Sequence, residues 1–175
     1  MARFVAGLEL DSKMARLAAN VLDEVFCGNI EVPEARYFAA RHKYDYIILG
    51  DVLEHLSDPS PVLRELAMTL KVGGRAIICV PNIRHIDVFI HIFLKKTWPR
   101  NARGIFDTTH KSFFTKHDLE TMIMMVGLKP ALWIRKFRYR DAIGSRFPWH
   151  GRLLKKCFPD LFTFQHIVVA EKPVR

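Results

Sequence analysis

The sequence predicts an α/β fold built on a parallel sheet, and three observations favour this class. Short apolar segments alternate along the chain with segments whose apolar residues recur three and four positions apart. The first kind is typical of buried strands and the second of helices, and their alternation is typical of a layered α/β domain. Glycine, proline and helix-capping residues separate the segments. The 175 residues, 50% of them hydrophobic, are enough for a single domain over 1–175.

The first half of the chain predicts three strands. Residues 4–9 and 24–27 are short apolar segments, and residues 44–49 are apolar on both faces, as expected of a central parallel strand covered on both sides. A helix capped by Ser12 is expected between the first two strands. Its apolar face consists of Met14, Leu17, Ala18, Val21 and Leu22. Residues 31–43 predict a loop or an irregular helical turn.

The second half continues the alternation of strands and helices. Ser60 and Pro61 are placed to begin a helix that Gly73 and Gly74 terminate. The other expected helices cover residues 83–96, residues 115–126 and a short segment near Leu153. The expected strands cover residues 76–80, 131–139 and 163–172. Thr115 and Asp118 form a capping pair, and Gly127 supplies a left-handed stop.

Composition excludes several classes of protein. The apolar stretch 86–94 is shorter than the roughly 20 residues that a membrane-spanning helix needs. The first residues lack the apolar core of a secretory leader, so we expect a cytoplasmic protein. Cys27, Cys79 and Cys157 are odd in number and widely spaced, which is typical of reduced thiols. We therefore expect neither a disulfide framework nor a zinc site.

The net charge of +9 comes mainly from the last third of the chain. The basic residues there are Arg135, Lys136, Arg138, Arg140, Arg146, Arg152, Lys155 and Lys156. A phosphate-bearing partner accounts for such an excess, and so does a solvated basic surface. Nucleic acid is not expected as a partner because no nucleic-acid-binding motif is present.

Three strand ends are candidate ligand sites, because ligands of open parallel sheets bind outside the carboxyl ends of the strands. Glu9 ends the first strand, where its carboxylate can accept both hydroxyl protons of a ribose or simply cap the next helix. Asn29 ends the second strand, where its amide can meet an adenine edge or form a turn. Gly50 and Asp51 end the third, where the missing side chain lets a ligand approach the backbone.

Two further clusters carry titratable groups. Asp51, Glu54 and His55 share one face if the chain turns helical there. Such a group can bind a divalent metal or provide a base that a neighbouring carboxylate orients, or it can simply be the start of a helix. His110 can take a proton from a hydroxyl substrate or bond to a carbonyl group. Because the other histidines lack ligand spacing, we assign no metal site from the sequence, and the metal role of Asp51, Glu54 and His55 stays open.

The order of these segments resembles the class I S-adenosylmethionine-dependent methyltransferase fold. The segment Asp51-Val52-Leu53-Glu54-His55-Leu56 is similar to the motif after the fourth strand of small-molecule O-methyltransferases, including the ubiquinone-type branch, whose acid-x-x-Glu-His can hold a metal. The resemblance implies S-adenosylmethionine as cofactor and His55 or His110 as the base that deprotonates the acceptor. It also implies the cofactor-binding residues Glu9, Leu10, Asn29, Ile30, Gly50 and Asp51.

The resemblance also bears on the acceptor and on the completeness of the sheet. Residues 81–85, 107–110 and 113–115 look like a bacterial subgroup encoded beside glycosyltransferases, which suggests a small-molecule or glycan hydroxyl as acceptor. The family's glycine-rich turn does not occur here, so we expect a Rossmann-like sheet with helices on both faces that lacks its first strand and first helix. Two functions follow as expectations: methyl transfer to a hydroxyl, or a non-catalytic fragment whose sheet a second copy or a partner chain completes.

Overall fold

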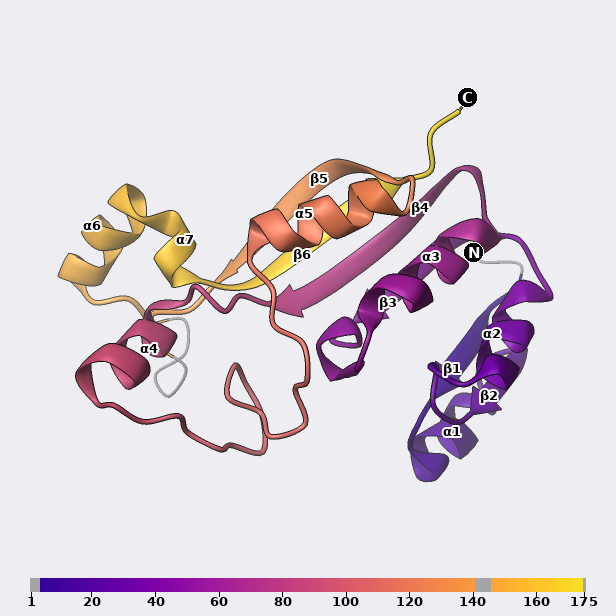
Figure 1. The fold of residues 1–175 in the computed structure, drawn as a ribbon, viewed down its shortest axis with the longest axis horizontal. Coiled ribbons are helices and arrows are strands. Elements are labelled where there is room, and N and C mark those ends of the chain that lie inside the picture. The colour runs from indigo at the N-terminus through magenta and orange to yellow at the C-terminus, as the bar shows by residue number, and fades with distance from the viewer. Residues whose placement is uncertain (1–3, 141–145, 175) are drawn as a thin grey trace.

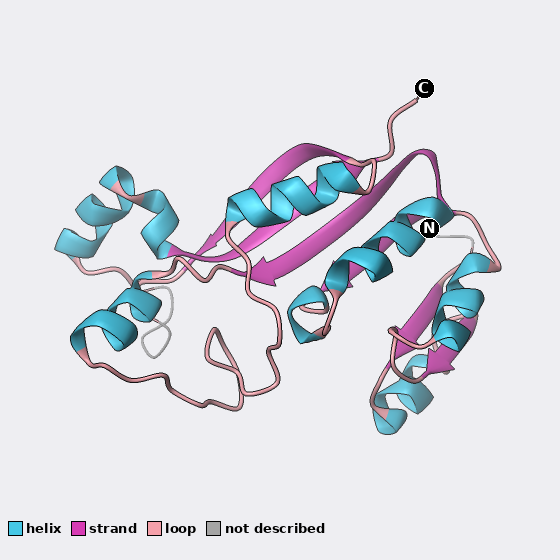
Figure 2. Cartoon of the chain, in the orientation of Figure 1, coloured by secondary structure: helices cyan, strands magenta, loops and turns pink. Residues whose placement is uncertain are grey.

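The computed structural model describes residues 4–140 and 146–174, whose strands form two sheets (Figures 1 and 2). Strand β1 (Ala6–Glu9) pairs in parallel with β2 (Glu24–Cys27). The second sheet has the order β3-β4-β6-β5. Its strands are β3 (Tyr44–Gly50), β4 (Leu70–Pro81), β5 (Lys129–Phe137) and β6 (Thr163–Glu171). Since β6 runs antiparallel to both neighbours, the carboxyl ends of β3, β4 and β5 meet at one edge.

Helices flank the strands and close one end of the molecule. The helices are α1 (Ser12–Ala18), α2 (Pro33–Ala40), α3 (Pro59–Thr69), α4 (Ile86–Phe89), α5 (Lys116–Met125), α6 (Trp149–Cys157) and α7 (Pro159–Phe162), with a 3₁₀ turn η1 (Leu53–His55) and a π turn η2 (Ile90–Leu94). Figure 1 shows α4, α6 and α7 gathered beyond the end of β4. None of the helices in the described part of the chain is long and apolar enough to cross a membrane.

The main core lies between the four-stranded sheet and helices α3 and α5. Leu63 of α3, Ile78 of β4 and Leu119 of α5 are each 1% exposed or less, and they belong to one cluster of buried side chains. Burying a side chain of this size contributes about 1.5–3 kcal/mol relative to leaving it in water. The core therefore fixes α3 and α5 on the sheet, and with them the loops at its carboxyl edge.

Helix α5 begins and ends where the sequence predicts. The Thr115 hydroxyl accepts a hydrogen bond from the Asp118 N–H at 3.2 Å, and the Asp118 carboxylate accepts one from the Thr115 N–H at 3.1 Å. Gly127 has a φ of 82°, which suits the left-handed residue after a helix. The capping pair and the glycine stop are thus confirmed.

Four expectations about helices are wrong. Asp11, not Ser12, caps α1, because its carboxylate accepts from the N–H groups of Lys13 and Met14. The expected apolar face is mostly exposed, because α1 ends at Ala18 and Val21 is 80% exposed. Residues 31–43 contain the regular helix α2. Residues 83–96 form two short elements, α4 and η2, in place of one helix.

Gly73 and Gly74 also differ from the prediction, because they lie within β4 and do not end a helix. Asp58, not Ser60, caps helix α3, which begins at Pro59 and passes directly into β4 at Leu70. Gly73 has a φ of 76°, and a Cβ on Gly74 would lie 2.9 Å from the Lys71 carbonyl oxygen. Glycine at both positions therefore permits the irregular start of this strand, where the pairing of β3 with β4 shifts register.

Strand β3 is covered on one face, whereas the sequence predicts cover on both. Leu49 is buried in the main core, but Tyr46 and Ile48 on the opposite face are 61% and 71% exposed. Among the described strands, β3 pairs only with β4, and β1 pairs only with β2. No described element packs on the Tyr46 face. The absence of a first strand and helix in this fold stays a prediction.

Candidate functional site

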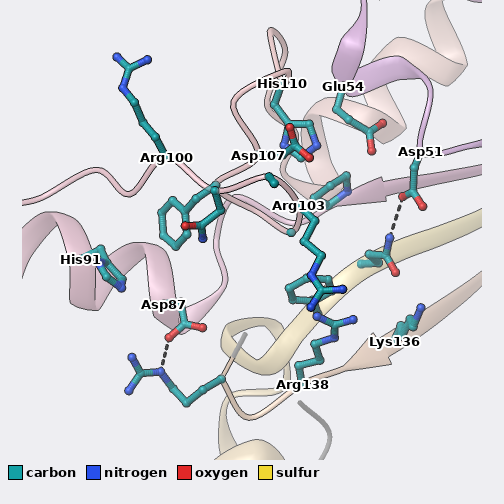
Figure 3. A pocket seen from close by; sticks show the side chains of 18 of the residues that line it. Asp51, Glu54, Asp87, His91, Arg100, Arg103, Asp107, His110, Lys136 and Arg138 are labelled. Carbon is teal, nitrogen blue, oxygen red and sulfur yellow. Dashed lines mark hydrogen bonds and ion pairs between the residues drawn. The ribbon is translucent and has the colours of Figure 1, made fainter. Parts of the chain in front are cut away.

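A cavity of about 1150 Å³ lies at the carboxyl edge of the four-stranded sheet (Figure 3). The ends of β3, β4 and β5 and the start of β6 form its floor, and the loop of residues 97–115 crosses over it. This volume is slightly above the range of roughly 300–1,000 Å³ that is typical of small-molecule sites. The cavity can therefore accommodate a large ligand or two smaller ones.

Asp51 stands directly after β3 in a constrained conformation. Its φ of 54° places the backbone in the left-handed region, which costs a residue with a side chain about 1 kcal/mol. The Asp51 N–H donates to the Cys79 carbonyl at 3.1 Å, and the Gln165 side-chain amide donates to Oδ1 at 2.7 Å (Figure 3). These bonds hold the Asp51 carboxylate at the cavity wall.

Glu54 is a buried carboxyl group without hydrogen-bond partners. Its residue is 1% exposed, and neither carboxylate oxygen has a partner among the described residues. Burial raises the pKa of Glu54 to about 8, and the charges of Asp51 and Asp107 add to the shift. Glu54 is thus largely protonated at neutral pH, which is unusual for a carboxyl group and typical of functional sites.

His55 is oriented by a chain of hydrogen bonds to the crossing loop. Its Nδ1 lies 3.0 Å from Oγ1 of Thr109, and that hydroxyl donates to Oδ1 of Asp107 at 2.6 Å. Since the Thr109 proton points to Asp107, the His55 Nδ1–H donates to Thr109. The bonds from Thr109 lower the pKa of Asp107. Nε2 of His55 is then left as a hydrogen-bond acceptor.

His110 lies beside His55, with ring centroids 4.9 Å apart. Its Nδ1–H donates to the carbonyl oxygen of Ile105 at 3.3 Å, which leaves Nε2 as the acceptor. Burial lowers the pKa of His110, so the imidazole is neutral at neutral pH. A neutral imidazole with a free Nε2 lone pair can take a proton from a bound hydroxyl.

Glu54, His55 and His110 together have the donor set of a metal site. One ligand atom from each lies within 4.8 Å of the others. Two imidazoles and a carboxylate suit a transition-metal dication such as Zn²⁺. The sequence suggested Asp51, Glu54 and His55 for this role. The tertiary structure places His110, which is 55 positions after His55 in the chain, in the cluster.

The six cofactor candidates divide into two groups. Gly50 and Asp51 stand at or beside the cavity, and a Cβ built on Gly50 meets no atom within 4 Å, so the space above the backbone is open. Glu9, Leu10, Asn29 and Ile30 do not line this cavity.

Glu9 and Asn29 make local hydrogen bonds at the ends of β1 and β2. Oε1 of Glu9 accepts from the Asp11 N–H at 2.9 Å, and Oδ1 of Asn29 accepts from the Glu31 N–H at 2.9 Å. Leu10 is 73% exposed, and Ile30 packs against the main core. Glu31 links the two sheets, because its carboxylate accepts from the N–H of Ser57 at 2.9 Å.

The cavity also has a cationic side, whereas the sequence predicted only an excess of basic residues in the last third of the chain. Lys136, Arg138 and Arg140 at the end of β5 line it together with Arg103 of the crossing loop. Arg140 is paired with the buried Asp87 (Figure 3). Strand alternation would not have revealed this set, because β5 ends at Phe137 and its register shifts between Lys136 and Phe137.

Comparisons with known proteins agree with the family resemblance and the fold. A family model described as "Methyltransferase domain" matches residues 5–131. A ubiquinone biosynthesis O-methyltransferase of Aeromonas salmonicida is 31% identical over 91 residues, which are 49% of this chain. The chain spans only 36% of the length of that relative.

Several solved structures share the fold at low sequence identity. A SAM-dependent methyltransferase from Archaeoglobus fulgidus has a TM-score of 0.62 at 15% identity, covering 95% of this chain and 75% of its own. A SAM-dependent methyltransferase from Methanosarcina mazei has a TM-score of 0.62 at 15% identity, and the match covers 98% of this chain and 82% of the other. Magnesium protoporphyrin IX methyltransferase from Synechocystis, solved with bound SAH, has a TM-score of 0.58 at 16% identity, and the match covers 97% of this chain and 64% of the other. The Rossmann-like α/β fold class is thereby confirmed.

Proposed function

Because the chain belongs to the methyltransferase-domain family, we propose that it transfers a methyl group from S-adenosylmethionine to a hydroxyl oxygen of a small molecule or sugar. The observation that carries this proposal is the paired imidazoles of His55 and His110 beside Gly50 and Asp51 at the carboxyl edge of the sheet. S-adenosylmethionine, when bound, supplies an electrophilic methyl group. The chain's own task is then to bind, orient and deprotonate the acceptor.

His110 is the better placed base of the pair. Its Nδ1 is committed to the Ile105 carbonyl, and its lowered pKa keeps Nε2 unprotonated at neutral pH. His55, tied to Thr109, supports the ring of His110 from the side. The carboxyl group of Glu54 completes the polar wall, and with both imidazoles it forms a site where a divalent metal would also lower the pKa of a bound hydroxyl.

The residues near the β3 end fit the cofactor. Open space above Gly50 admits a ligand to the backbone, and the fixed carboxylate of Asp51 is available to a cationic group. Glu9, Leu10, Asn29 and Ile30 are proposed for the nucleoside. One oxygen of Glu9, Oε2, accepts no hydrogen bond from the described residues and can receive a ribose hydroxyl.

A calorimetric titration of S-adenosylhomocysteine into the chain and into Gly50→Val tests the binding half of the proposal. Valine suits a strand end, and its Cβ meets no protein atom, so the variant is expected to fold and to lose binding at least tenfold because its side chain occupies the ligand space. Ile48→Val is the matched control on the same strand, and its affinity should be unchanged. Equal affinities of all three proteins would contradict a cofactor site at Gly50.

A methyl-transfer assay over a panel of hydroxyl compounds tests the chemical half. His110→Asn is expected to reduce the rate about 10²–10⁴-fold, as for loss of a general base, without changing S-adenosylhomocysteine affinity. The assay is repeated with a chelator and with added Zn²⁺, which separates a base from a metal ligand. A His110→Asn variant that is as fast as the wild type would rule out this residue as the base.

A non-catalytic role is the second candidate, and a specific observation favours it. Oε1 of Glu9 and Oδ1 of Asn29 accept local hydrogen bonds away from the cavity, and β1 and β3 each pair on one edge only among the described strands. In this alternative the chain is a pairing module whose sheet a second copy or a partner chain completes. A folded, monodisperse wild-type sample that does not bind S-adenosylhomocysteine supports this alternative over the enzyme.

A further inference from the structure

Charge is distributed unevenly across the cavity, from an acidic side to a basic side. The carboxylates of Asp51 and Asp107 lie on the side of β3 and η1, whereas Lys136 and Arg138 lie at the end of β5 (Figure 3). The sheet order β3-β4-β6-β5 puts two strands between the two sides. With strands about 4.8 Å apart, the backbones of β3 and β5 are about 14 Å apart. Gln165 of β6, which pairs with Lys136 and donates to Asp51, lies between the two sides.

Three cations of the basic side, Arg103, Lys136 and Arg138, line the same part of the cavity. Arg103 points across the cavity toward Arg138 (Figure 3). Within the described part of the chain, no carboxylate lies within 4.0 Å of Arg103 or Lys136. By contrast, Arg140 is paired with Asp87, and Arg100 points away from the cavity.

Arg138 has a defined position. Its guanidinium carbon stands 3.9 Å from the centroid of the buried Phe164 ring, in a cation–π contact. A guanidinium that is held in place loses less side-chain entropy when it binds an anion, and its planar donors match phosphate oxygens. Like charges converging from two elements repel one another, and a multivalent anion between them removes that repulsion.

We propose that the acceptor is a phosphate- or diphosphate-bearing hydroxyl compound, bound with its phosphate between Arg103, Lys136 and Arg138 and its hydroxyl toward His110. This inference rests on the proposed methyl transfer and names its substrate class. The acidic side repels the phosphate, so the charge distribution sets the direction of the acceptor. The cavity of about 1150 Å³ has room for a phosphorylated sugar or a sugar diphosphate derivative.

The position of the basic side separates it from the proposed nucleoside site. Glu9 ends β1 and Asn29 follows β2, and Figure 1 shows these two strands on the side of β3 and α3, opposite β5. The carboxylate of the cofactor's amino-acid part is the competing anion for these cations. The cations therefore need a test that distinguishes an acceptor phosphate from a cofactor carboxylate.

The test is a calorimetric titration of pyrophosphate, and separately of S-adenosylhomocysteine, into the wild type, Arg103→Gln, Lys136→Gln and Arg64→Gln. Arg64 is exposed on α3 and lies outside the cavity, so its variant removes the same charge as a matched control. We expect saturable pyrophosphate binding by the wild type, weakened about tenfold in each cavity variant and less than twofold in Arg64→Gln. Melting curves check that every variant is folded.

Three outcomes would overturn the anionic acceptor. These are no saturable pyrophosphate binding by the wild type, equal weakening in Arg64→Gln, and a parallel loss of S-adenosylhomocysteine affinity in both cavity variants. The second indicates diffuse surface charge, and the third assigns the cations to the cofactor carboxylate. A wild type that binds pyrophosphate but not S-adenosylhomocysteine instead contradicts the methyl transfer on which the inference rests.

Discussion

Replacing Glu54 by glutamine should stabilise the protein, and the gain should grow with pH. Glu54 is buried without hydrogen-bond partners, and its pKa in the folded state is about 8 against 4.5 for an unperturbed glutamate. Below 4.5 both states are protonated, so the group has no effect on stability. As pH rises from 4.5 to about 8, the unfolded state loses its proton and the folded state does not, which favours unfolding.

The size of the loss in stability follows from the difference between the pKa values of Glu54 in the folded and unfolded states. Each pH unit above 4.5 costs about 1.4 kcal/mol until the folded group ionises as well. The free energy of unfolding is therefore lowered by about 3 kcal/mol at pH 7. Glutamine has a similar shape and no charge to lose, so Glu54→Gln removes this cost. For a chain of this length, 3 kcal/mol corresponds to a rise in Tm of about 6–12 °C.

Thermal melts of the wild type and Glu54→Gln from about pH 5.5 to about pH 8 measure this difference, which should increase by about 3 kcal/mol over the range. Glu120→Gln on α5, outside the cavity, is the control and should show no such trend. A difference in Tm between wild type and Glu54→Gln that is the same at every pH would refute the reasoning. A difference in Tm that increases with pH would mean that the site keeps a destabilising carboxyl group, as functional sites often do.

Three further predictions concern the core, the strained turn and a buried histidine. Leu119→Ala should cost about 2–5 kcal/mol in a urea titration because Leu119 is fully buried, whereas the exposed Met125→Ala should change little. Asp51→Val should be about 1–3 kcal/mol less stable than Asp51→Gly, since only glycine adopts a φ of 54° without strain, and equal stabilities would contradict this. Burial lowers the pKa of His166 to about 4 from 6.5, so stability should fall as pH drops from 6.5 to 4. His166→Gln should reduce that loss in acid melts, and an unchanged acid profile would assign it to other groups.

Local sequence decided most of the elements. The capping pair at Thr115 and the stop at Gly127 delimit α5 because side-chain hydrogen bonds and a glycine backbone act within a few residues. Apolar runs predicted β2, β3 and the other strands for the same reason. The errors at α1 and β3 arose because an apolar residue shows only a capacity for burial, and Val21 and Ile48 have no described element to cover them.

The site needed the tertiary structure. The sequence by itself indicated the family and the strands that end near Glu9, Asn29 and Gly50, and it singled out His55 and His110 as candidate bases. Only the fold decided that His110 lies against His55, that Glu54 is buried without partners, and that Arg103 faces Arg138. Periodicity and capping are short-range, whereas these contacts join positions far apart in the chain through the order of strands in the sheet. The pKa values and the charge distribution of the cavity depend on that order.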